Sequence, residues 1–562
     1  MRKEKGVLFM MAGAMIGLAA GCGRPTLDGE ARAFIEAHVQ AVQPLEKAMN
    51  LAYWQANVTG DQASYQLYAE YQLALRRVLS DTAAFAKVKA LKESKQVRDP
   101  RLARQVTLLY NQYLANQIPP DLLEEITRLS TRVEETFNTF QPVMDGKPVS
   151  TNDIADILRL STDSEQRRRA WEAGKEVGGK VAPDLLRLVK LRNEAARRLG
   201  FPNYYSMAVE LAELDEEGLV TIFQELAELT DEPFRRLKAK VDSILAAQYG
   251  LSPEQLRPWH YHDPFFQEAP RIYEFDIDGY YREQDVVRLA RTFFAGLGLE
   301  VDSVLARSDL YERAGKNPHA FCTDIDREGD VRVLANVRND ARWMDTMLHE
   351  LGHAVYDVYI DRRLPYVLRE PAQAFTTEGI AEFFGRLALN PLWVQGMLGL
   401  SDQQREAIQD AMNESTRLKQ LVFCRWCQVM VNFERELYRD PDQDLNRLWW
   451  DLVERYQLVH RPERRDAPDW AAKIHFSSSP VYYHNYMLGE LMASQLHHSL
   501  VSKVLKRPAG SEVGYVGERR VGVFLKKHIF APGTLYHWND LITRATGQPL
   551  TAAYFAEQFA KP

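Results

Sequence analysis

The sequence predicts a mainly α-helical fold in which one large domain forms two lobes around a deep cleft, with a small β-sheet near the candidate site. Apolar residues recur at helical spacing over long stretches of the chain, whereas one segment alternates as a strand does. No low-complexity linker or internal repeat divides the chain. Its 562 residues, 46% of them hydrophobic, are enough to build a large core.

The individual elements follow from these patterns in chain order. Long helices are expected at residues 28–59, 61–82, 120–140, 164–200, 216–249 and 402–438. Pro- and Gly-rich stretches at 251–270 and 507–519 are typical of loops. Residues 330–336 alternate and are rich in β-branched side chains, which predicts a strand.

The N-terminus has the composition of an export signal. Basic residues precede the apolar run 7–20, which is too short to span a membrane. The run ends Leu-Ala-Ala-Gly-Cys22, which resembles a bacterial lipoprotein signal. We therefore expect removal of 1–21, a lipid on Cys22, a tether at 22–27 and a single domain at 28–562. Plain export and an uncleaved anchor are the alternatives. Gly23, in place of aspartate, favours the periplasmic side of the outer membrane.

Charge and cysteine content exclude some classes of function. The formal net charge of -7 leaves no basic stripe for nucleic acid, so no nucleic-acid partner is expected. Three cysteines remain besides Cys22, and an odd number leaves at least one free or bridged to another molecule. Cys424 and Cys427 form a C-x-x-C inside a predicted helix without a second ligand pair. They are interpreted as small core residues.

The segment His349-Glu350-Leu351-Gly352-His353 is the most informative motif of the chain. Residues i and i+4 lie on one helix face, so His349 and His353 can bind a single metal ion. Glu350 then lies beside the metal without binding it. This H-E-x-x-H arrangement is that of zinc peptidases, with two ligands and a general base. The flanking residues keep an apolar helical pattern, and no proline interrupts 340–360.

A catalytic zinc takes three protein ligands and a water. Glu378, 25 residues after His353, is the predicted third ligand of one Zn²⁺ ion, and the apolar helical run 379–389 follows it. Glu382 lies one helical turn later, where its carboxylate can accept the free ring N–H of a ligand histidine. A glutamate ligand on a later helix is typical of the glutamate-zincin peptidases.

This region resembles the angiotensin-converting-enzyme family of peptidyl-dipeptidases, including the run 364–370 before Glu378. The resemblance spans most of the chain and is strongest from about residue 317 onward. It implies a large helical metallopeptidase with a substrate cleft. The family usually has aspartate where this chain has Glu382, and histidine where it has Thr377. Neither difference replaces a predicted zinc ligand.

The resemblance also implies roles for residues that surround the substrate. His319 occupies the place of a substrate-pocket histidine, and the strand at 330–336 would hold the peptide extended as an edge strand. Lys473 matches the lysine that grips the substrate's C-terminal carboxylate. His475, two residues later, matches the histidine that stabilises the oxyanion.

Two tyrosines complete the implied site. Tyr483 and Tyr486, with Gly489 and Gln495, fit the family spacing if one residue is inserted within 476–479. Tyr486 would then stabilise the oxyanion, and Tyr483 would assist carboxylate binding. Tyr482 is the alternative if the register shifts by one residue.

The chain lacks two arginines through which animal members of this family bind chloride. Asn485 and Val453 stand at those positions. Activity is therefore expected to be independent of chloride.

The sequence thus predicts a zinc-dependent peptidase that hydrolyses oligopeptides and releases C-terminal dipeptides, with Glu350 as general base for the attacking water. A thimet- or oligoendopeptidase-like enzyme, which cuts internally, is the main alternative, and a carboxypeptidase is another. A non-catalytic zinc-dependent peptide-binding lipoprotein is also considered, although such a binder would not need Glu350. The expected partners are oligopeptides and, through the lipid anchor, a membrane.

Overall fold

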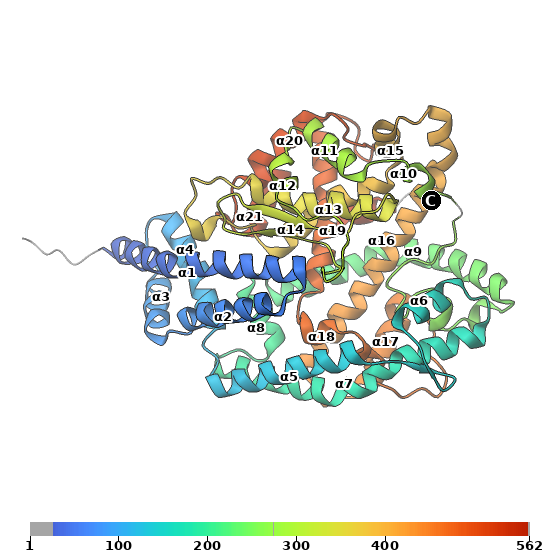
Figure 1. The fold of residues 1–562 in the computed structure, drawn as a ribbon, viewed down its shortest axis with the longest axis horizontal. Coiled ribbons are helices and arrows are strands. Elements are labelled where there is room, and N and C mark those ends of the chain that lie inside the picture. The colour runs from blue at the N-terminus through green and yellow to red at the C-terminus, as the bar shows by residue number, and fades with distance from the viewer. Residues whose placement is uncertain (1–25, 274, 560–562) are drawn as a thin grey trace, which may run out of the picture.

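Helices make up most of the structure, a computed structural model that describes residues 26–273 and 275–559 (Figure 1). The mainly α-helical prediction is confirmed, and the described strands form two small two-stranded sheets. The predicted signal segment 1–21 and Cys22 lie outside the described residues. Within the described ranges, none of the helices combines the length and apolarity that a membrane span requires.

Four N-terminal helices form a group with a hydrophobic core of its own, coloured blue at the left of Figure 1. They are α1 (Leu27–Thr59), α2 (Gln62–Leu79), α3 (Thr82–Ser94) and α4 (Pro100–Ala115). The helix expected at 61–82 ends at Leu79, because the Asp81 carboxylate accepts two backbone N–H groups and caps α3. Leu108 packs against both this core and the main one.

The lower and right parts of Figure 1 contain the next long helices. They are α5 (Pro120–Thr139), α6 (Thr151–Leu160), α7 (Ser164–Arg198), α8 (Tyr204–Leu211) and α9 (Glu216–Tyr249). A hairpin of β1 (Val143–Met144) and β2 (Lys147–Pro148) separates α5 from α6. Asp145 and Gly146 turn it with φ values of 54° and 75°, the backbone form that a two-residue hairpin turn requires.

The upper part of Figure 1 holds a compact set of shorter helices. They are α10 (Asp278–Tyr281), α11 (Val286–Gly296), α12 (Asp302–Leu305), α13 (Ala341–Val358), α14 (Ala374–Gly385), α15 (Pro391–Leu398), α19 (His484–Ser499), α20 (Arg519–Leu525) and α21 (Trp538–Thr546). The last described helix, α22 (Ala553–Glu557), packs against α19.

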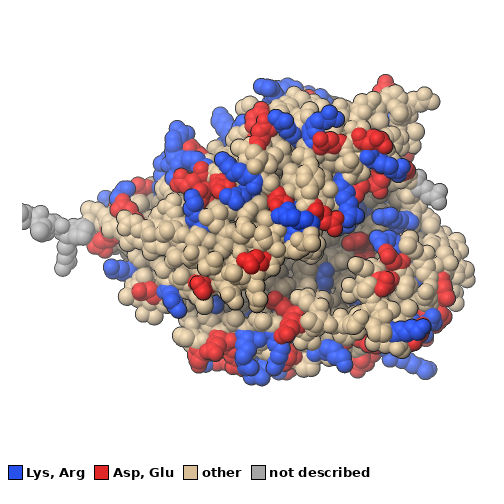
Figure 2. Space-filling view, in the orientation of Figure 1, with Lys and Arg blue, Asp and Glu red and all other residues tan. Residues whose placement is uncertain are grey.

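Helix α16 (Asp402–Arg439) runs diagonally between the upper and lower parts in Figure 1. Near its lower end lie α17 (Leu445–Gln457) and the short α18 (His475–Ser478). One continuous core runs through both parts, and Figure 2 shows a recess between them. Cys424 and Cys427 are fully buried free thiols of α16, as expected of core residues.

The second sheet pairs β3 (Phe321–Asp324) with β4 (Val331–Leu334) in antiparallel order. The strand predicted at 330–336 is β4, so its existence is confirmed. Its expected position at the sheet edge is wrong, because Leu334 also bridges Asp309 on the other side and β4 is mostly buried. The strand that faces the candidate site is β3, which is four residues long.

Candidate metal centre and active site

Helix α13 brings the two motif histidines to one face. The helix begins after Asp340, whose side chain accepts the Trp343 backbone N–H at 2.7 Å. An apolar stripe that includes Met344, Leu348 and Leu351 is fully buried and fixes the opposite face in the core. The His349 and His353 ring centroids lie 4.9 Å apart.

Glu378 on α14 completes a three-residue cluster with these histidines. Its Oε2 atom lies 3.8 Å from Nε2 of His349 and 3.8 Å from Nε2 of His353. In the described part of the chain, these three residues form the one His/Cys/Asp/Glu group with metal-binding geometry. Ligand atoms around a tetrahedral zinc lie about 3.4 Å apart, so shifts of a few tenths of an ångström fit the ion. The cluster is therefore suited to hold zinc.

Close contacts between helices set this alignment. A Cβ atom on Gly352 would lie 2.8 Å from the Ala381 Cα, so α13 and α14 cross without room for a methyl group. On the other side of α14, a Cβ on Gly489 of α19 would lie 3.0 Å from the Glu378 Cβ. Glycines thus let three helices approach closely enough for His353 and Glu378 to share a site.

The outer nitrogens of the two histidines have different neighbours. Nδ1 of His349 lies 3.8 Å from Glu382 Oε1, which is beyond hydrogen-bond distance. Nδ1 of His353 lies 2.7 Å from the Thr377 hydroxyl oxygen. With Nε2 directed at the metal, that Nδ1 carries the proton and Thr377 accepts it, an orienting contact that the sequence analysis missed. The position of Thr377 next to Glu378 in the sequence is the feature from which this contact could have been predicted.

Glu350 is a buried residue, only 8% exposed, and borders the cavities on both sides of the histidine cluster. The pKa of its carboxyl group is raised to about 7, mainly by burial, with His349 opposing the shift and Glu378 adding to it. Burial and Glu490 together raise the pKa of Glu382 to about 8. Glu350 lies next to the candidate metal site and borders both cavities, so its carboxyl group is suited to exchange protons with a reacting water.

Helix α19 and the segment before it contribute the tyrosines. Tyr486 lines the same cavity as the histidine cluster, and its ring lies 5.3 Å from that of Tyr483. Tyr483 lies deeper, where its hydroxyl oxygen accepts the Trp426 Nε1–H at 2.8 Å. Tyr482 donates its hydroxyl proton to Glu378 Oε1 at 3.0 Å, so it contacts the third candidate ligand.

Lys473 and His475 lie around Tyr483 and do not line the cavity of the histidine cluster. The His475 and Tyr483 ring centroids are 5.1 Å apart. The Lys473 ammonium lies over the rings of Tyr483, Trp426 and Phe265 and donates to Gln267 Oε1 at 2.6 Å. Burial lowers the pKa of Lys473 to about 8. Burial and then Lys473 lower the pKa of His475 to about 4, and its Nδ1 atom has no partner.

A cavity of about 690 Å³ opens beside the histidine cluster. Its walls come from α1, β3, α13, the segment before α14 and Tyr486. His319 is exposed and is not among the wall residues, although its neighbours Ala320 and Phe321 are. A second cavity of about 340 Å³ lies on the other side of His349 and Glu350, against α16.

Comparison with known proteins connects this geometry to a family. A family model described as angiotensin-converting enzyme matches residues 26–260 and 271–562. Thermostable carboxypeptidase 1 of Pyrococcus furiosus is 23% identical over 432 residues, which cover 71% of this chain and 77% of that protein. Angiotensin-converting enzyme of Rattus norvegicus is 23% identical over 445 residues, 73% of this chain but 33% of the rat enzyme. The family match covers most of the chain, so this protein belongs to the angiotensin-converting enzyme family and is a zinc metallopeptidase.

Proposed function

We propose that the protein hydrolyses oligopeptides by releasing dipeptides from their C-termini. The observation that carries this proposal is the buried Lys473 ammonium, held with Gln267 beside Tyr483 and set apart from the histidine cluster. A fixed cation at that place can bind a terminal carboxylate, and so measure the cleaved bond from the end of the peptide. Gln267 is a further candidate ligand for that carboxylate.

The chain's own residues can perform the proton transfers of peptide hydrolysis. His349, His353 and Glu378 would hold one zinc ion, which supplies a Lewis acid that acidifies water and polarises the scissile carbonyl. Glu350 would accept the proton of the attacking water and deliver it to the leaving amine.

Charge also develops on the carbonyl oxygen during the reaction. Tyr486 and His475 are the proposed hydrogen-bond donors to this oxyanion, and pre-aimed donors of this kind lower the barrier most where water is excluded. The hydroxyl of Tyr486 suits this role because burial raises its pKa to about 12 and keeps it protonated.

The proposed location is the periplasmic side of the bacterial outer membrane, where a lipid on Cys22 would anchor the protein. The Leu-Ala-Ala-Gly-Cys ending of the N-terminal apolar run supports this proposal. We also propose that one zinc ion suffices and that chloride is not required.

A hexapeptide with a free C-terminus, compared with its C-terminally amidated form, tests the proposal. Purified zinc-loaded protein should release a dipeptide from the free acid and leave the amide uncut, as read by mass spectrometry. Glu350→Gln is the control for contaminating peptidases and should release nothing. Internal cleavage of both peptides would contradict dipeptide release and favour an internal oligopeptidase. Removal of single residues would indicate a carboxypeptidase, and no cleavage would indicate a binding protein.

A further inference from the structure

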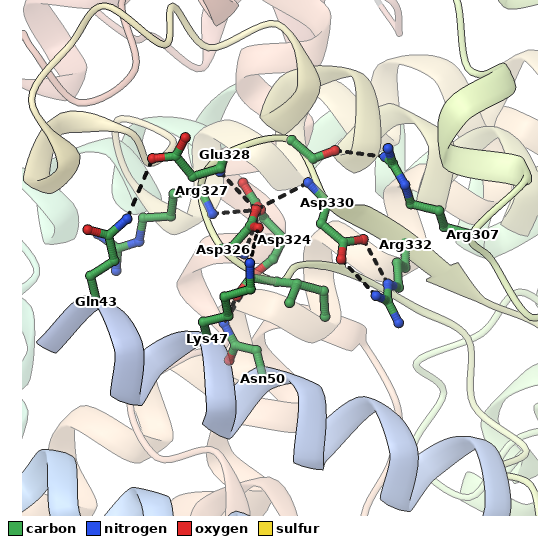
Figure 3. A network of polar contacts seen from close by, with 12 residues as sticks. Gln43, Lys47, Asn50, Arg307, Asp324, Asp326, Arg327, Glu328, Asp330 and Arg332 are labelled. Carbon is green, nitrogen blue, oxygen red and sulfur yellow. Dashed lines mark hydrogen bonds and ion pairs between the residues drawn. The ribbon is translucent and has the colours of Figure 1, made fainter.

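The larger cavity extends from His353 toward α1 and the loop between β3 and β4. Figure 3 shows α1 fastened to that loop: Lys47 contacts Asp326 at 3.0 Å, and Asn50 donates to the Asp324 and Ile325 carbonyl oxygens at 3.2 Å each. Asp326 in turn accepts the backbone N–H groups of the loop. These contacts hold α1 and the β3–β4 loop together, and the two form the cavity wall opposite α13.

Most charged side chains of this wall neutralise one another. Arg327 contacts Glu46 at 3.0 Å and Glu370 at 2.5 Å, and Arg369 contacts Glu328 at 2.6 Å. These arginines already have acidic partners, and those acids already have basic ones. They leave little free charge with which to bind a substrate.

Asp357 is different from these residues. It lies on α13 four residues after His353 and lines the cavity, where its side chain is partly exposed. Among the described residues, no hydrogen bond or ion pair to its carboxylate oxygens is present. Burial and the charge of Asp324 raise its pKa well above the usual value, although Arg362 opposes the shift. Arg362 donates instead to the Asp357 backbone carbonyl at 3.1 Å. Among the described residues, the carboxyl group thus has no hydrogen-bonded or ion-paired cation, although Arg362 and Arg327 are near enough to lower its pKa.

The position of Lys473 gives the direction of a bound peptide. Lys473 lies over Trp426 of α16, one helical turn beyond Phe423, which lines the smaller cavity. The C-terminal part of the substrate would therefore lie on the α16 side of the zinc cluster. Its N-terminal part would lie in the larger cavity, toward Asp357. The four helical residues from His353 to Asp357 advance about 6 Å, and two extended residues of a peptide span about 7 Å. Asp357 is therefore placed to meet the second peptide residue N-terminal to the cleaved bond.

We propose that Asp357 selects substrates that carry a cationic group on the second residue N-terminal to the cleaved bond. The cation is an ammonium or guanidinium group, supplied by a lysine or arginine side chain or by the peptide's own N-terminus. This inference rests on the proposed dipeptide release and adds to it the chemical class of the preferred substrate. A bound cation would favour the ionised form of this carboxyl group, and a charged pair in a partly desolvated wall is stronger than an exposed one.

The test measures kcat/KM on acetylated pentapeptides that differ only at that residue, which is Lys, Met or Glu. The wild-type enzyme should have a kcat/KM about tenfold higher for the Lys peptide than for the Met peptide, because a hydrogen bond to a charged group contributes about that much to binding. Asp357→Asn should bring this ratio near one, and Asp357→Lys should favour Glu. The ratio is internal to each variant, so it does not depend on the fraction of folded enzyme.

Two further comparisons complete the experiment. Asp361→Asn is the matched control: Asp361 follows on the same chain segment, pairs with Arg363 at 2.7 Å and does not line the cavity, so its variant should keep the preference. A tetrapeptide with uncharged side chains, compared with its N-terminus free and acetylated, separates the two sources of the cation, the side chain and the N-terminal ammonium. Preference for the free form, lost in Asp357→Asn, assigns the N-terminal ammonium; preference for Lys alone assigns the side chain.

The outcomes distinguish the two proposals. Dipeptide release with neither a Lys preference nor an effect of acetylation would overturn the role of Asp357 and leave the proposed function standing. A preference that survives Asp357→Asn would overturn it as well. Failure to release a dipeptide from any of these peptides would overturn the proposed function, and with it this inference.

Discussion

The outer nitrogen of His353 lies 2.7 Å from the hydroxyl oxygen of Thr377. Such a contact fixes the ring orientation and tautomer of a ligand histidine. Thr377→Val, which keeps the shape but removes the acceptor, is expected to weaken zinc binding about 10- to 100-fold. Competition with a chelator measures this. Thr346→Val on α13 is the control, because that hydroxyl donates to the Arg342 carbonyl instead. Equal zinc affinity in both variants would refute the assignment.

The charge of Lys473 should impose a pH limit on the enzyme. Burial lowers its pKa to about 8, so the free enzyme keeps the cation below that pH and loses it above. For peptides with a free C-terminus, kcat/KM should therefore fall as pH rises through about 8. Arginine stays charged across this range, so Lys473→Arg should move the fall to higher pH. A wild-type profile that stays flat to about pH 9.5 would exclude this role for Lys473.

At the level of single residues, the sequence predicted what local spacing determines. His349 and His353 are four residues apart on one helix, so their common face follows from helix geometry alone. The contact of Lys473 with Gln267 joins residues 206 positions apart, and no local pattern indicates it. The exposure of His319 likewise depends on how its loop folds back, which composition does not determine.

Among the helices, the crossing of α13 and α14 depends on Gly352. A methyl group there would lie 2.8 Å from the Ala381 Cα, and overpacking of this kind costs about 1–3 kcal/mol. Gly352→Ala should therefore lower the free energy of unfolding and displace Glu378 from the histidines. Thermal unfolding with and without zinc measures both effects, and the zinc-dependent gain in Tm should shrink.

Gly179 provides the matched control, because it lies in α7 with nothing within 4 Å of its missing Cβ. Gly179→Ala should raise stability by up to about 1 kcal/mol through helix propensity. If both substitutions changed stability in the same direction, the close helix crossing would not explain the effect at Gly352.

Long helices were well predicted, since apolar periodicity extends over many turns; the range 216–249 matches α9 at both ends. Short elements were not. β3 is four residues long, and every one of them is only partly buried, so no alternation marks it as a strand. The structure identifies β3 as the edge strand, because β4 pairs with β3 on one side and is bridged by Asp309 on the other.

For the whole molecule, we expect catalysis without chloride. Asn485 and Val453, the two positions at which the family resemblance implies a chloride-binding arginine in animal members, are buried and uncharged, at 4% and 5% exposure. Neither can offer a cation to an anion. The rate of dipeptide release should stay constant when sodium chloride replaces an equal ionic strength of sodium acetate. A several-fold rise with chloride would contradict this expectation.

Anchoring can be tested on the full chain in a bacterial host. Cys22 should incorporate a labelled fatty acid, and the protein should fractionate with the outer membrane. Cys22→Ser removes the thiol that accepts the lipid, so the variant should lose the label. Cys322→Ser is the control, since that thiol is free but lies in β3. Label that persists in the Cys22 variant would argue against lipidation at this residue.

The braced wall of α1 over the larger cavity has a consequence for the surroundings of the enzyme. A space of about 690 Å³ admits a few extended residues, which is the scale of a small ligand rather than of a folded domain. Folded proteins would be too large to enter this space, whereas short peptides would fit. The cavity would therefore select substrates by size, so that only short peptide fragments reach the zinc-binding residues.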